Sequence, residues 1–380
     1  MFKINTRLLK NIDFVFVINV IAILAVGIMI LPSASASVTS NPLYFVKKQL
    51  IAILIGCIVM VFTASINYRY IRRFVRHLYI LNILMLITVL VIGTEINGAK
   101  SWIKLGPLAL QPSELSKIIM IVCFADFLDK RQGKLKRLRD FIPCFLFFAI
   151  PLMLIMLQPD MGSGLVFVAI MLGMMLVGGA NLKLLSGLVG GGFIAGVASI
   201  WAHFKFGMPL PLKYHQIMRL IAFINPYADG EGGRGAGYHI IQSKVAIGSG
   251  GLTGKGLFKG SQVQLNFLPE HHTDFIFSVI GEELGFIGGA LLLLLFLSLI
   301  YRAVQIALNA KDMFGVLIVI GFSSMIVFHV LVNVGMTIGL MPVVGIPLPF
   351  VSYGGSAMLA NMTALGLILN INMRRKKIPF

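Results

Sequence analysis

The chain has 380 residues, of which 58% are hydrophobic and only 12% are charged. A mean hydropathy of +0.92 excludes an ordinary soluble globular protein, and repeated apolar runs of membrane-spanning length indicate a polytopic helical membrane protein. The formal net charge of +18 would favour a nucleic-acid partner in a soluble protein. Here the Lys and Arg residues sit mainly in short loops, as orientation in a membrane requires, so we expect no nucleic acid.

The apolar runs predict ten transmembrane helices and therefore an all-α fold, in a single membrane domain that covers residues 1–380. We expect the first span to remain uncleaved because its run is longer than a signal-peptide core, with a cleavable signal peptide as the alternative. The predicted spans are residues 14–31, 46–65, 78–94, 114–129, 141–157, 164–180, 184–203, 274–300, 314–335 and 355–371.

The distribution of positive charge predicts the orientation of these spans. With the N-terminus inside, the inner segments carry twenty Lys and Arg residues and the short outer segments carry four. Short loops decide orientation, whereas long loops are translocated largely regardless of charge. We therefore expect both termini in the cytoplasm. The loop between spans seven and eight, residues 204–273, is then a large extracytoplasmic loop.

Two other outer segments differ from plain connectors. Residues 98–113 are amphipathic and include Trp102, so we expect them to lie on the membrane surface. Residues 341–356 contain three prolines and three glycines, yet they are strongly apolar. Such a segment can re-enter the bilayer where it lines a cavity or is buried in protein. All the irregular segments are predicted outside, so the chemistry or recognition is expected there.

Four carboxylates fall within residues 268–286, where the long loop joins an apolar run. Glu270 and Asp274 lie at the boundary, and Asp274 is placed to cap the helix that follows. Glu282 and Glu283 fall inside the predicted span. Ionised groups there are costly and usually face a wet cavity or a partner helix. The stretch is typical of a membrane active site.

Further polar residues occur at helix spacings. Glu114 and Lys117 share a helix face at i and i+3. A capping acid and a snorkelling lysine are the alternative, but Lys117 would lie below the surface and need a counter-charge, so we favour a functional pair. Asp160 opens another helix, where capping alone explains it and a functional role is the equal alternative. His329 and Asn333 share a face at i and i+4 and are expected to form interhelical hydrogen bonds.

Five motifs in order resemble the SEDS family (shape, elongation, division and sporulation), whose members include RodA and FtsW. The resemblance covers nearly all of the chain, and its QSKVAIGSGG and GKGLFKGSQ stretches resemble the RodA branch more than FtsW. The motifs are NGAKSWIKLGPLALQPSELSK at 97–117, QPDMGSG at 158–164, GAGYHIIQSKVAIGSGGLTGKG at 235–256, FLPEHHTDFIFSVIGEELGF at 267–286 and PLPFVSYGGS at 347–356.

This resemblance implies a peptidoglycan glycosyltransferase. It would polymerise lipid II into glycan strands at the outer face of the bacterial cytoplasmic membrane, during cell elongation and rod-shape maintenance. The implied partners are a class B penicillin-binding protein (a transpeptidase), elongation-complex proteins, the lipid II substrate and membrane lipid. The family's essential aspartate maps to Asp274, and its glutamate and lysine map to Glu114 and Lys117.

Glycosyl transfer from a lipid diphosphate needs a base for the acceptor hydroxyl and cations for the departing diphosphate. Asp274 is the expected base or a metal ligand, Lys117 is the expected diphosphate contact, and Glu114 positions Lys117 or binds metal. A divalent cation, Mg²⁺ or Mn²⁺, is the expected cofactor, with Asp274 and Glu114 as its ligands. Further substrate contacts are expected from Arg219, Lys255, His272, Ser352 and Ser356.

Two other functions fit parts of the pattern. A lipid II flippase would also use ten spans, and Glu282 and Glu283 would serve a proton relay. A flippase needs access from both membrane faces, whereas the irregular segments are all predicted on one. A scaffold that recruits cell-wall enzymes is the other alternative, and it predicts that charge-neutral changes at Asp274 are harmless.

Overall fold

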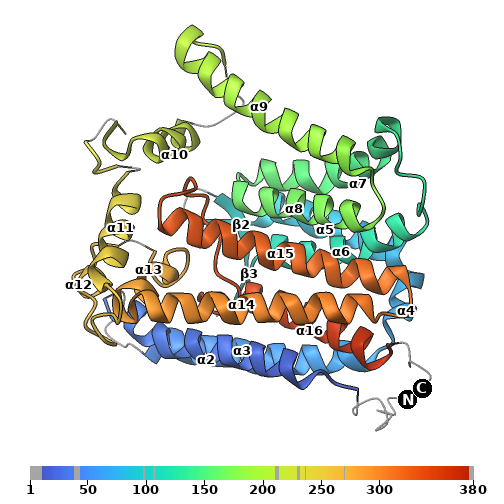
Figure 1. Cartoon of the computed structure of the whole chain (residues 1–380), viewed down its shortest axis with the longest axis horizontal. Coiled ribbons are helices and arrows are strands. Elements are labelled where there is room, and N and C mark those ends of the chain that lie inside the picture. The colour runs from blue at the N-terminus through green and yellow to red at the C-terminus, as the bar shows by residue number, and fades with distance from the viewer. Residues whose placement is uncertain are drawn as a thin grey trace.

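The computed structural model describes residues 11–37, 43–96, 99–105, 108–209, 214–228, 232–235, 237–268 and 270–375. These residues form a bundle of long helices with one small sheet (Figure 1). The elements are α2 (Phe14–Ser35), α3 (Leu43–Ser65), α4 (Tyr68–Ile71), η1 (Arg72–Phe74), α5 (Val75–Ile92), β1 (Thr94–Ile96), β2 (Ala99–Leu105), β3 (Leu108–Leu110), α6 (Pro112–Asp129), α7 (Leu138–Leu157), α8 (Met161–Val177), α9 (Leu182–Phe206), α10 (Tyr214–Ile224), η2 (Pro226–Ala228), α11 (Tyr238–Gly250), α12 (Ser261–Gln264), α13 (Ile276–Glu283), α14 (Gly285–Leu308), α15 (Met313–Thr337) and α16 (Gly355–Met373).

The chain is a multi-pass membrane protein. In the part that the structure describes, eight helical segments are long and apolar enough to cross a membrane. The two other predicted spans are also helices, but α8 has only 17 residues and α6 carries four charged side chains within 18 residues. The eight segments are α2, α3, the continuous stretch Tyr68–Ile92, α7, residues 182–203 of α9, α14, α15 and α16.

Helices α15 and α16 form the centre of the bundle. Helix α15 packs against α6, α8 and α14, whereas α16 packs against α3 and α6. The two ends of the described chain meet beside them, because Asn11 donates a hydrogen bond to the Met373 carbonyl oxygen at 3.2 Å. The side chains of α15 are therefore able to reach several elements at once.

Helix α2 is an integral part of this bundle. Its Ile23 and Ile30 side chains are fully buried, and the helix packs against α14. Asp13 caps its first turn and forms an ion pair with Arg302 of α14, with Nη2 and Oδ2 2.6 Å apart. That the first span remains uncleaved stays a prediction.

The predicted span 274–300 is wrong, because the helix is broken between α13 and α14. Gly285 at the break has φ +67°, which favours glycine. A Cβ atom at Gly285 would lie 2.3 Å from the Gly254 backbone nitrogen, so the loop could not approach a larger residue. Glu282 and Glu283 consequently lie at the end of a short helix and not within a continuous span.

The bundle is helical, as the sequence predicts, but part of the segment 98–113 forms a small sheet with the residues that precede it. Strands β1, β2 and β3 form a three-stranded antiparallel sheet among the described residues. Glu95 pairs with Lys100 and Ile103 with Leu110. The hairpin satisfies backbone groups that an irregular segment would leave unpaired.

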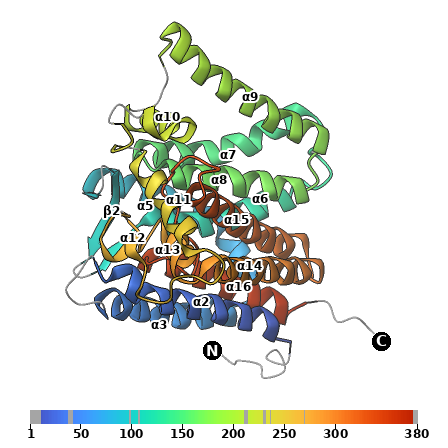
Figure 2. The same cartoon turned by 60° about the vertical axis from the view of Figure 1, so that its left-hand side comes forward.

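The predicted long loop, 204–273, contains regular structure. Helices α10, α11 and α12 lie within it, and they gather with α13 at one end of the bundle (Figure 1). Figure 2 brings this end forward and shows α11, α12 and α13 side by side, in agreement with their contacts. The apolar segment 341–354 has no regular structure but is buried in the protein, with Ile346 and Leu348 at most 2% exposed.

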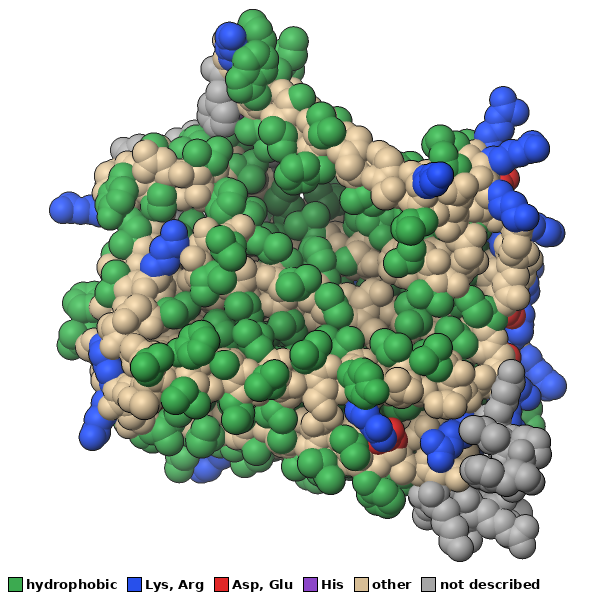
Figure 3. Space-filling view, viewed as in Figure 1, with side chains coloured by type: hydrophobic (Ala, Val, Ile, Leu, Met, Phe, Trp, Pro, Cys, Tyr) green, Lys and Arg blue, Asp and Glu red, His purple; other side chains and the backbone are tan. Residues whose placement is uncertain are grey.

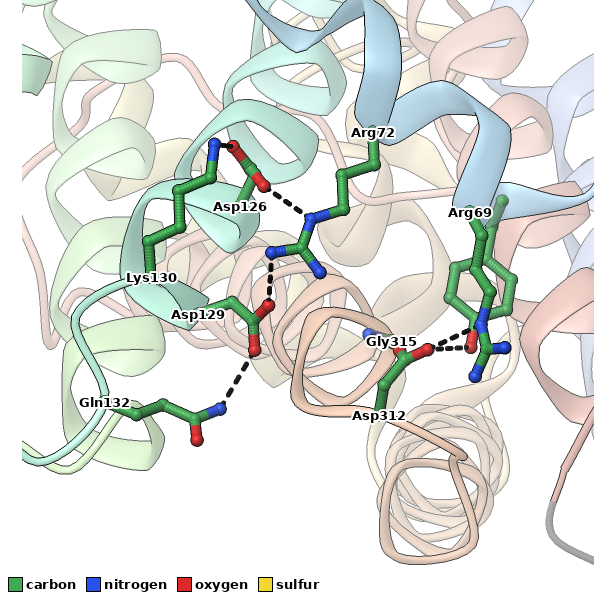
Figure 4. A network of polar contacts seen from close by, with 9 residues as sticks. Arg69, Arg72, Asp126, Asp129, Lys130, Gln132, Asp312 and Gly315 are labelled. Atoms are coloured by element: carbon green, nitrogen blue, oxygen red, sulfur yellow. Dashed lines mark hydrogen bonds and ion pairs between the residues drawn. The ribbon is translucent and has the colours of Figure 1, made fainter.

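Ion pairs fasten the opposite end of the bundle (Figure 4). Arg72 binds Asp126 and Asp129 of α6 at 2.7 and 2.6 Å, and Arg69 binds Asp312 at the start of α15 at 2.8 Å. In Figure 3, Lys and Arg side chains gather at this end, on the right of the view. The two ends of the bundle therefore differ in character, one basic and the other built from the irregular segments.

Helix α9 stands apart from the rest. It contacts α8 and then leaves the bundle, with Phe193 74% exposed and Ile194 68% exposed. Figure 3 shows a hollow lined by hydrophobic side chains beneath it. Exposed apolar surface of this extent is expected on a helix that faces lipid.

Candidate active site

The predicted pair of Glu114 and Lys117 is present and buried. Pro112 opens α6, where its missing N–H costs nothing, and Glu114 lies in the first turn. The Lys117 Nζ atom lies 2.7 Å from Glu114 Oε1. The Lys117 side chain is 2% exposed, so an unpaired ammonium there would be costly. Glu114 therefore supplies the counter-charge that the sequence predicts.

His329 of α15 is a third member of this group. Its Nε2 atom lies 3.4 Å from Lys117 Nζ, and its Nδ1 atom lies 3.0 Å from the Pro347 carbonyl oxygen. An ammonium group only donates hydrogen bonds, so Nε2 accepts and the ring proton sits on Nδ1. The prediction that His329 bonds to other elements is confirmed.

Asp274 lies in the turn that precedes α13. The N-cap of α13 is Phe275, so the alternative role of Asp274 as a helix cap is wrong. Asn333 of α15 donates to the Asp274 carbonyl oxygen at 2.8 Å. This acceptor lies in a turn, so the interhelical bond predicted for Asn333 is wrong in its partner. The carboxylate rests against the 341–354 segment, because a Cβ at Gly345 would lie 3.1 Å from Asp274 Oδ2.

The surroundings of Asp274 favour its protonated form more than water does. Burial raises the pKa of Asp274 to about 7, with a further increase from the negative charge of Glu270. Arg219 opposes this change, and Asp160 adds to it. A carboxyl group with a pKa near the working pH suits a general base. Arg219 is exposed on α10, where it is free to contact a substrate.

Asp160 joins the starts of two helices near this site. Its Oδ1 atom accepts from the Ser163 backbone nitrogen at 2.9 Å and caps α8, as the sequence predicts. Its Oδ2 atom accepts from Gln111 Nε2 at 3.1 Å. Gln111 immediately precedes α6, so Asp160 fixes α8 relative to the helix that carries Glu114 and Lys117.

The predicted substrate residues Ser352 and Ser356 are both engaged by backbone groups. Ser352 Oγ donates to the Thr273 carbonyl oxygen at 2.6 Å. Ser356 Oγ accepts from the Gln111 backbone nitrogen at 2.9 Å. These bonds join the irregular segment to the turn of Asp274 and to the start of α6. Substrate contact by either hydroxyl stays a prediction.

His272 faces an aromatic cluster next to Asp274. Its ring centroid lies 4.8 Å from that of Phe45 and 6.1 Å from that of Tyr353. Burial lowers the pKa of His272, so the ring is mainly neutral at pH 7. A neutral, partly exposed imidazole beside aromatic rings remains available for hydrogen bonding to a sugar.

Lys255 is held by Glu282 rather than by the group around Asp274. The Nζ and Oε1 atoms are 2.8 Å apart, and Glu282 Oε1 also accepts from the Gln262 backbone nitrogen at 3.1 Å. Glu283 accepts from Ser33 Oγ of α2. Both glutamates are fully buried and hold the 251–262 loop against α13. Glu282 is thus paired with the loop, whereas Glu283 also bonds to a second helix, α2, as the structural alternative predicts.

His239 is a site residue that sequence reasoning missed. Its ring stacks on Phe275, with centroids 5.8 Å apart and planes inclined by 15°. Burial lowers the pKa of His239, and the charge of Arg219 lowers it further. Its position in a helix within the long loop gave no periodic signal. Only the packing of α11 against α13 brings it beside Asp274.

The protein side chains do not form a ready-made metal centre. Across the residues that the structure describes, no group of three or more His, Cys, Asp and Glu side chains is placed to hold a metal ion. Glu114, one of the two predicted ligands, already binds Lys117. Metal binding by Asp274 and Glu114 stays a prediction.

Comparison with known proteins places the chain in a family. The profile for FtsW, RodA and SpoVE, described as cell cycle proteins, matches residues 13–377. The chain belongs to this family. The probable peptidoglycan glycosyltransferase FtsW of Trichlorobacter lovleyi is 38% identical over 378 residues, covering 98% of this chain and 96% of the relative.

Two solved structures of similar chains agree with this family assignment. The rod shape determining protein RodA of Thermus thermophilus has a TM-score of 0.70 at 31% identity, covering 96% of this chain and 98% of its own. A chain from "Structural coordination of polymerization and crosslinking by a peptidoglycan synthase complex" has a TM-score of 0.79 at 30% identity, with the same coverage. The chain is therefore similar to members of both the FtsW and the RodA branches of the family.

Proposed function

We propose that the chain is a peptidoglycan glycosyltransferase that polymerises lipid II during elongation and rod-shape maintenance. The observation that carries this proposal is the convergence of Asp274 with the buried Glu114–Lys117 pair through α15. Glycosyl transfer from a lipid diphosphate requires a base and a cation, and here both candidate groups are held by contacts with α15. The RodA-like motifs support the elongation role, and the relatives named as glycosyltransferases support the activity.

In the proposed reaction, Asp274 takes the proton of the acceptor sugar hydroxyl as its oxygen attacks the anomeric carbon of the donor. The bond from that carbon to the diphosphate oxygen breaks, and its electron pair leaves with the diphosphate. Lys117 has three N–H groups, two of which face Glu114 and His329. The third is available to donate to a diphosphate oxygen and stabilise the developing charge.

We further propose that α6 and α8 complete a set of ten spans, with both termini cytoplasmic and residues 204–273 outside. The basic end of the bundle, with Arg69, Arg72 and Lys130, then faces the cytoplasm. Asp274 and helices α10 to α13 then lie on the outer face, where lipid II presents its sugars. The polyprenyl tail would stay in the bilayer.

A class B penicillin-binding protein is the proposed partner, together with elongation-complex proteins. A similar chain in a complex described as coordinating polymerization and crosslinking supports this proposal. A divalent cation, Mg²⁺ or Mn²⁺, remains part of the proposal. Mg²⁺ is commonly bound by one or two carboxylates together with substrate phosphates, so Asp274 and the lipid diphosphate would suffice without a prebuilt site.

The test is to incubate lipid II with the protein fused to its cognate transpeptidase, with and without divalent cation. A parallel sample carries Asp274→Asn. Glycan ladders from the wild type alone would establish a polymerase that depends on Asp274, and the cation series would decide the metal. A folded, partnered wild type that makes no ladder would contradict the proposal. The lipid II flippase would then be tested in liposomes.

A further inference from the structure

Two side chains of α15 occupy the site without a role in the proposed chemistry. His329 and Asn333 lie one helical turn apart, His329 is 4% exposed, and Asn333 is fully buried. Burying such polar groups costs free energy unless they form hydrogen bonds. Their partners therefore indicate their function.

His329 is a second partner of the Lys117 ammonium besides Glu114. Lys117 Nζ lies 2.7 Å from Glu114 Oε1 and 3.4 Å from His329 Nε2. The other ring nitrogen of His329 donates to the Pro347 carbonyl oxygen at 3.0 Å, which fixes the ring orientation. The ammonium is thus held between two acceptors, and the direction of its third N–H follows from the other two.

Asn333 binds the turn that contains Asp274 to the same buried segment that His329 contacts. Its Nδ2 atom donates to the Asp274 carbonyl oxygen and to the Ile346 carbonyl oxygen, each at 2.8 Å. Ile346 directly precedes Pro347, so His329 and Asn333 bind consecutive carbonyls of one buried segment. Gly345, just before them, is the residue on which the Asp274 carboxylate rests.

We propose that His329 and Asn333 are positioning residues for glycosyl transfer. His329 fixes the ammonium of Lys117, and Asn333 fixes the main chain of Asp274. The inference rests on the proposed function and extends it to two residues that do not touch the reacting atoms. Displacing a reacting group by 1 Å lowers a rate by about 100-fold, so such residues act on kcat more than on KM.

Two substitutions at His329 separate its two contacts. Gln places its amide near the position of His Nε2, and its oxygen accepts a hydrogen bond from Lys117. Asn places its amide near Nδ1 and donates to the Pro347 oxygen, but it does not reach Lys117. We expect His329→Gln to keep kcat within about threefold of wild type, and His329→Asn to lower kcat by about 100-fold with KM for lipid II nearly unchanged.

Asn333→Leu, which keeps the volume but removes both donors, should lower kcat to a similar extent. Ser323→Ala is the matched control in α15, because Ser323 is also buried and, among the described residues, its hydroxyl bonds only back to Val319 of the same helix. It should leave kcat unchanged. Thermal unfolding of each purified complex verifies that the variants are folded.

The measurement is lipid II polymerisation by the complex with its transpeptidase, with kcat and KM determined for each variant. If the wild type is active and the His329→Asn variant is fully active, the inference about positioning is overturned but the proposed function is not. Greater activity in His329→Asn than in His329→Gln would do the same, because the contact to Pro347 would then be the one that matters. An inactive wild type would reject the proposed function as well.

Discussion

The surroundings of the Asp274 carboxyl group suit it to the proposed role of a base. Burial and the negative charge of Glu270 raise its pKa to about 7, and Arg219 limits the increase. A base works only when deprotonated. We therefore expect kcat/KM for lipid II polymerisation to rise with pH and to reach half its maximum near pH 7.

The pH–rate profile of the transpeptidase complex checks this prediction. Burial lowers the pKa of His239, His271 and His272, so these imidazoles lose their protons at lower pH than Asp274 does. Their titration would therefore not change the rate near pH 7 in this profile. A profile that is flat between pH 5.5 and 8.5 would contradict the role of Asp274 as the base.

The Glu114–Lys117 pair predicts a large effect of removing one partner. Glu114→Gln would leave the Lys117 ammonium, 2% exposed, without its counter-charge. Breaking a buried pair in this way typically costs about 3–5 kcal/mol. We expect a lower melting temperature in detergent and loss of polymerisation.

A double variant separates the charge effect from loss of packing. Glu114→Gln with Lys117→Met removes both charges, so part of the stability should return while activity stays absent. Equal melting temperatures for the single variant and wild type would show that the pair does not stabilise the bundle.

At the scale of elements, the apolar runs predicted most of the helices, but they did not predict where a helix is interrupted. Apart from Glu282 and Glu283, the run after Asp274 is largely apolar through Tyr301, and no proline marks the break at Gly285. The break depends on the 251–262 loop, which approaches the Gly285 backbone. Sequence periodicity is local, so it could not reveal a contact made by a distant loop.

The same limit explains which site residues could be predicted. Glu114 and Lys117 lie on one helix, so their i, i+3 spacing was sufficient. The contact of His329 with Lys117 joins residues 212 positions apart, and it required the packing of α15 on α6. The motif around Asp274 was sufficient to predict it as a site residue. Its hydrogen bond from Asn333 and the proximity of its carboxylate to Gly345 are visible only in the structure.

The 251–262 loop packs closely against the end of α13, so substitutions at two glycines should differ in their effect on stability. Gly254 has φ +79°, and a Cβ there would lie 2.1 Å from the Glu283 carbonyl oxygen. Gly133 has φ +74° but no atom within 4 Å of such a Cβ. Gly254→Ala must displace the loop, whereas Gly133→Ala adds only backbone strain, about 1–3 kcal/mol.

We expect Gly254→Ala to lower the melting temperature well below that of Gly133→Ala and to reduce polymerisation, because the loop leads into the turn of Asp274. Thermal unfolding and glycan ladders of both variants give the comparison. Equal behaviour of the two would show that the close approach at Gly254 is unimportant.

For the whole molecule, the proposed orientation predicts opposite labelling of two exposed positions. Tyr227 follows α10 in the proposed outer loop, and Gln132 lies near the ion pairs of Figure 4. After replacement of the three native cysteines, Tyr227→Cys should react with a membrane-impermeant maleimide in spheroplasts. Gln132→Cys should react only after lysis. The reverse pattern would invert the topology and place Asp274 in the cytoplasm.

The frame around α15 also has a consequence for how the protein is made. Lys117 leaves the ribosome long before His329, Asn333 and the carbonyls of Ile346 and Pro347 have been synthesised. A nascent chain halted after α9 therefore lacks every contact that α15 provides to the catalytic groups. Under the proposed function, we therefore expect a chain that ends before α15 to make no glycan.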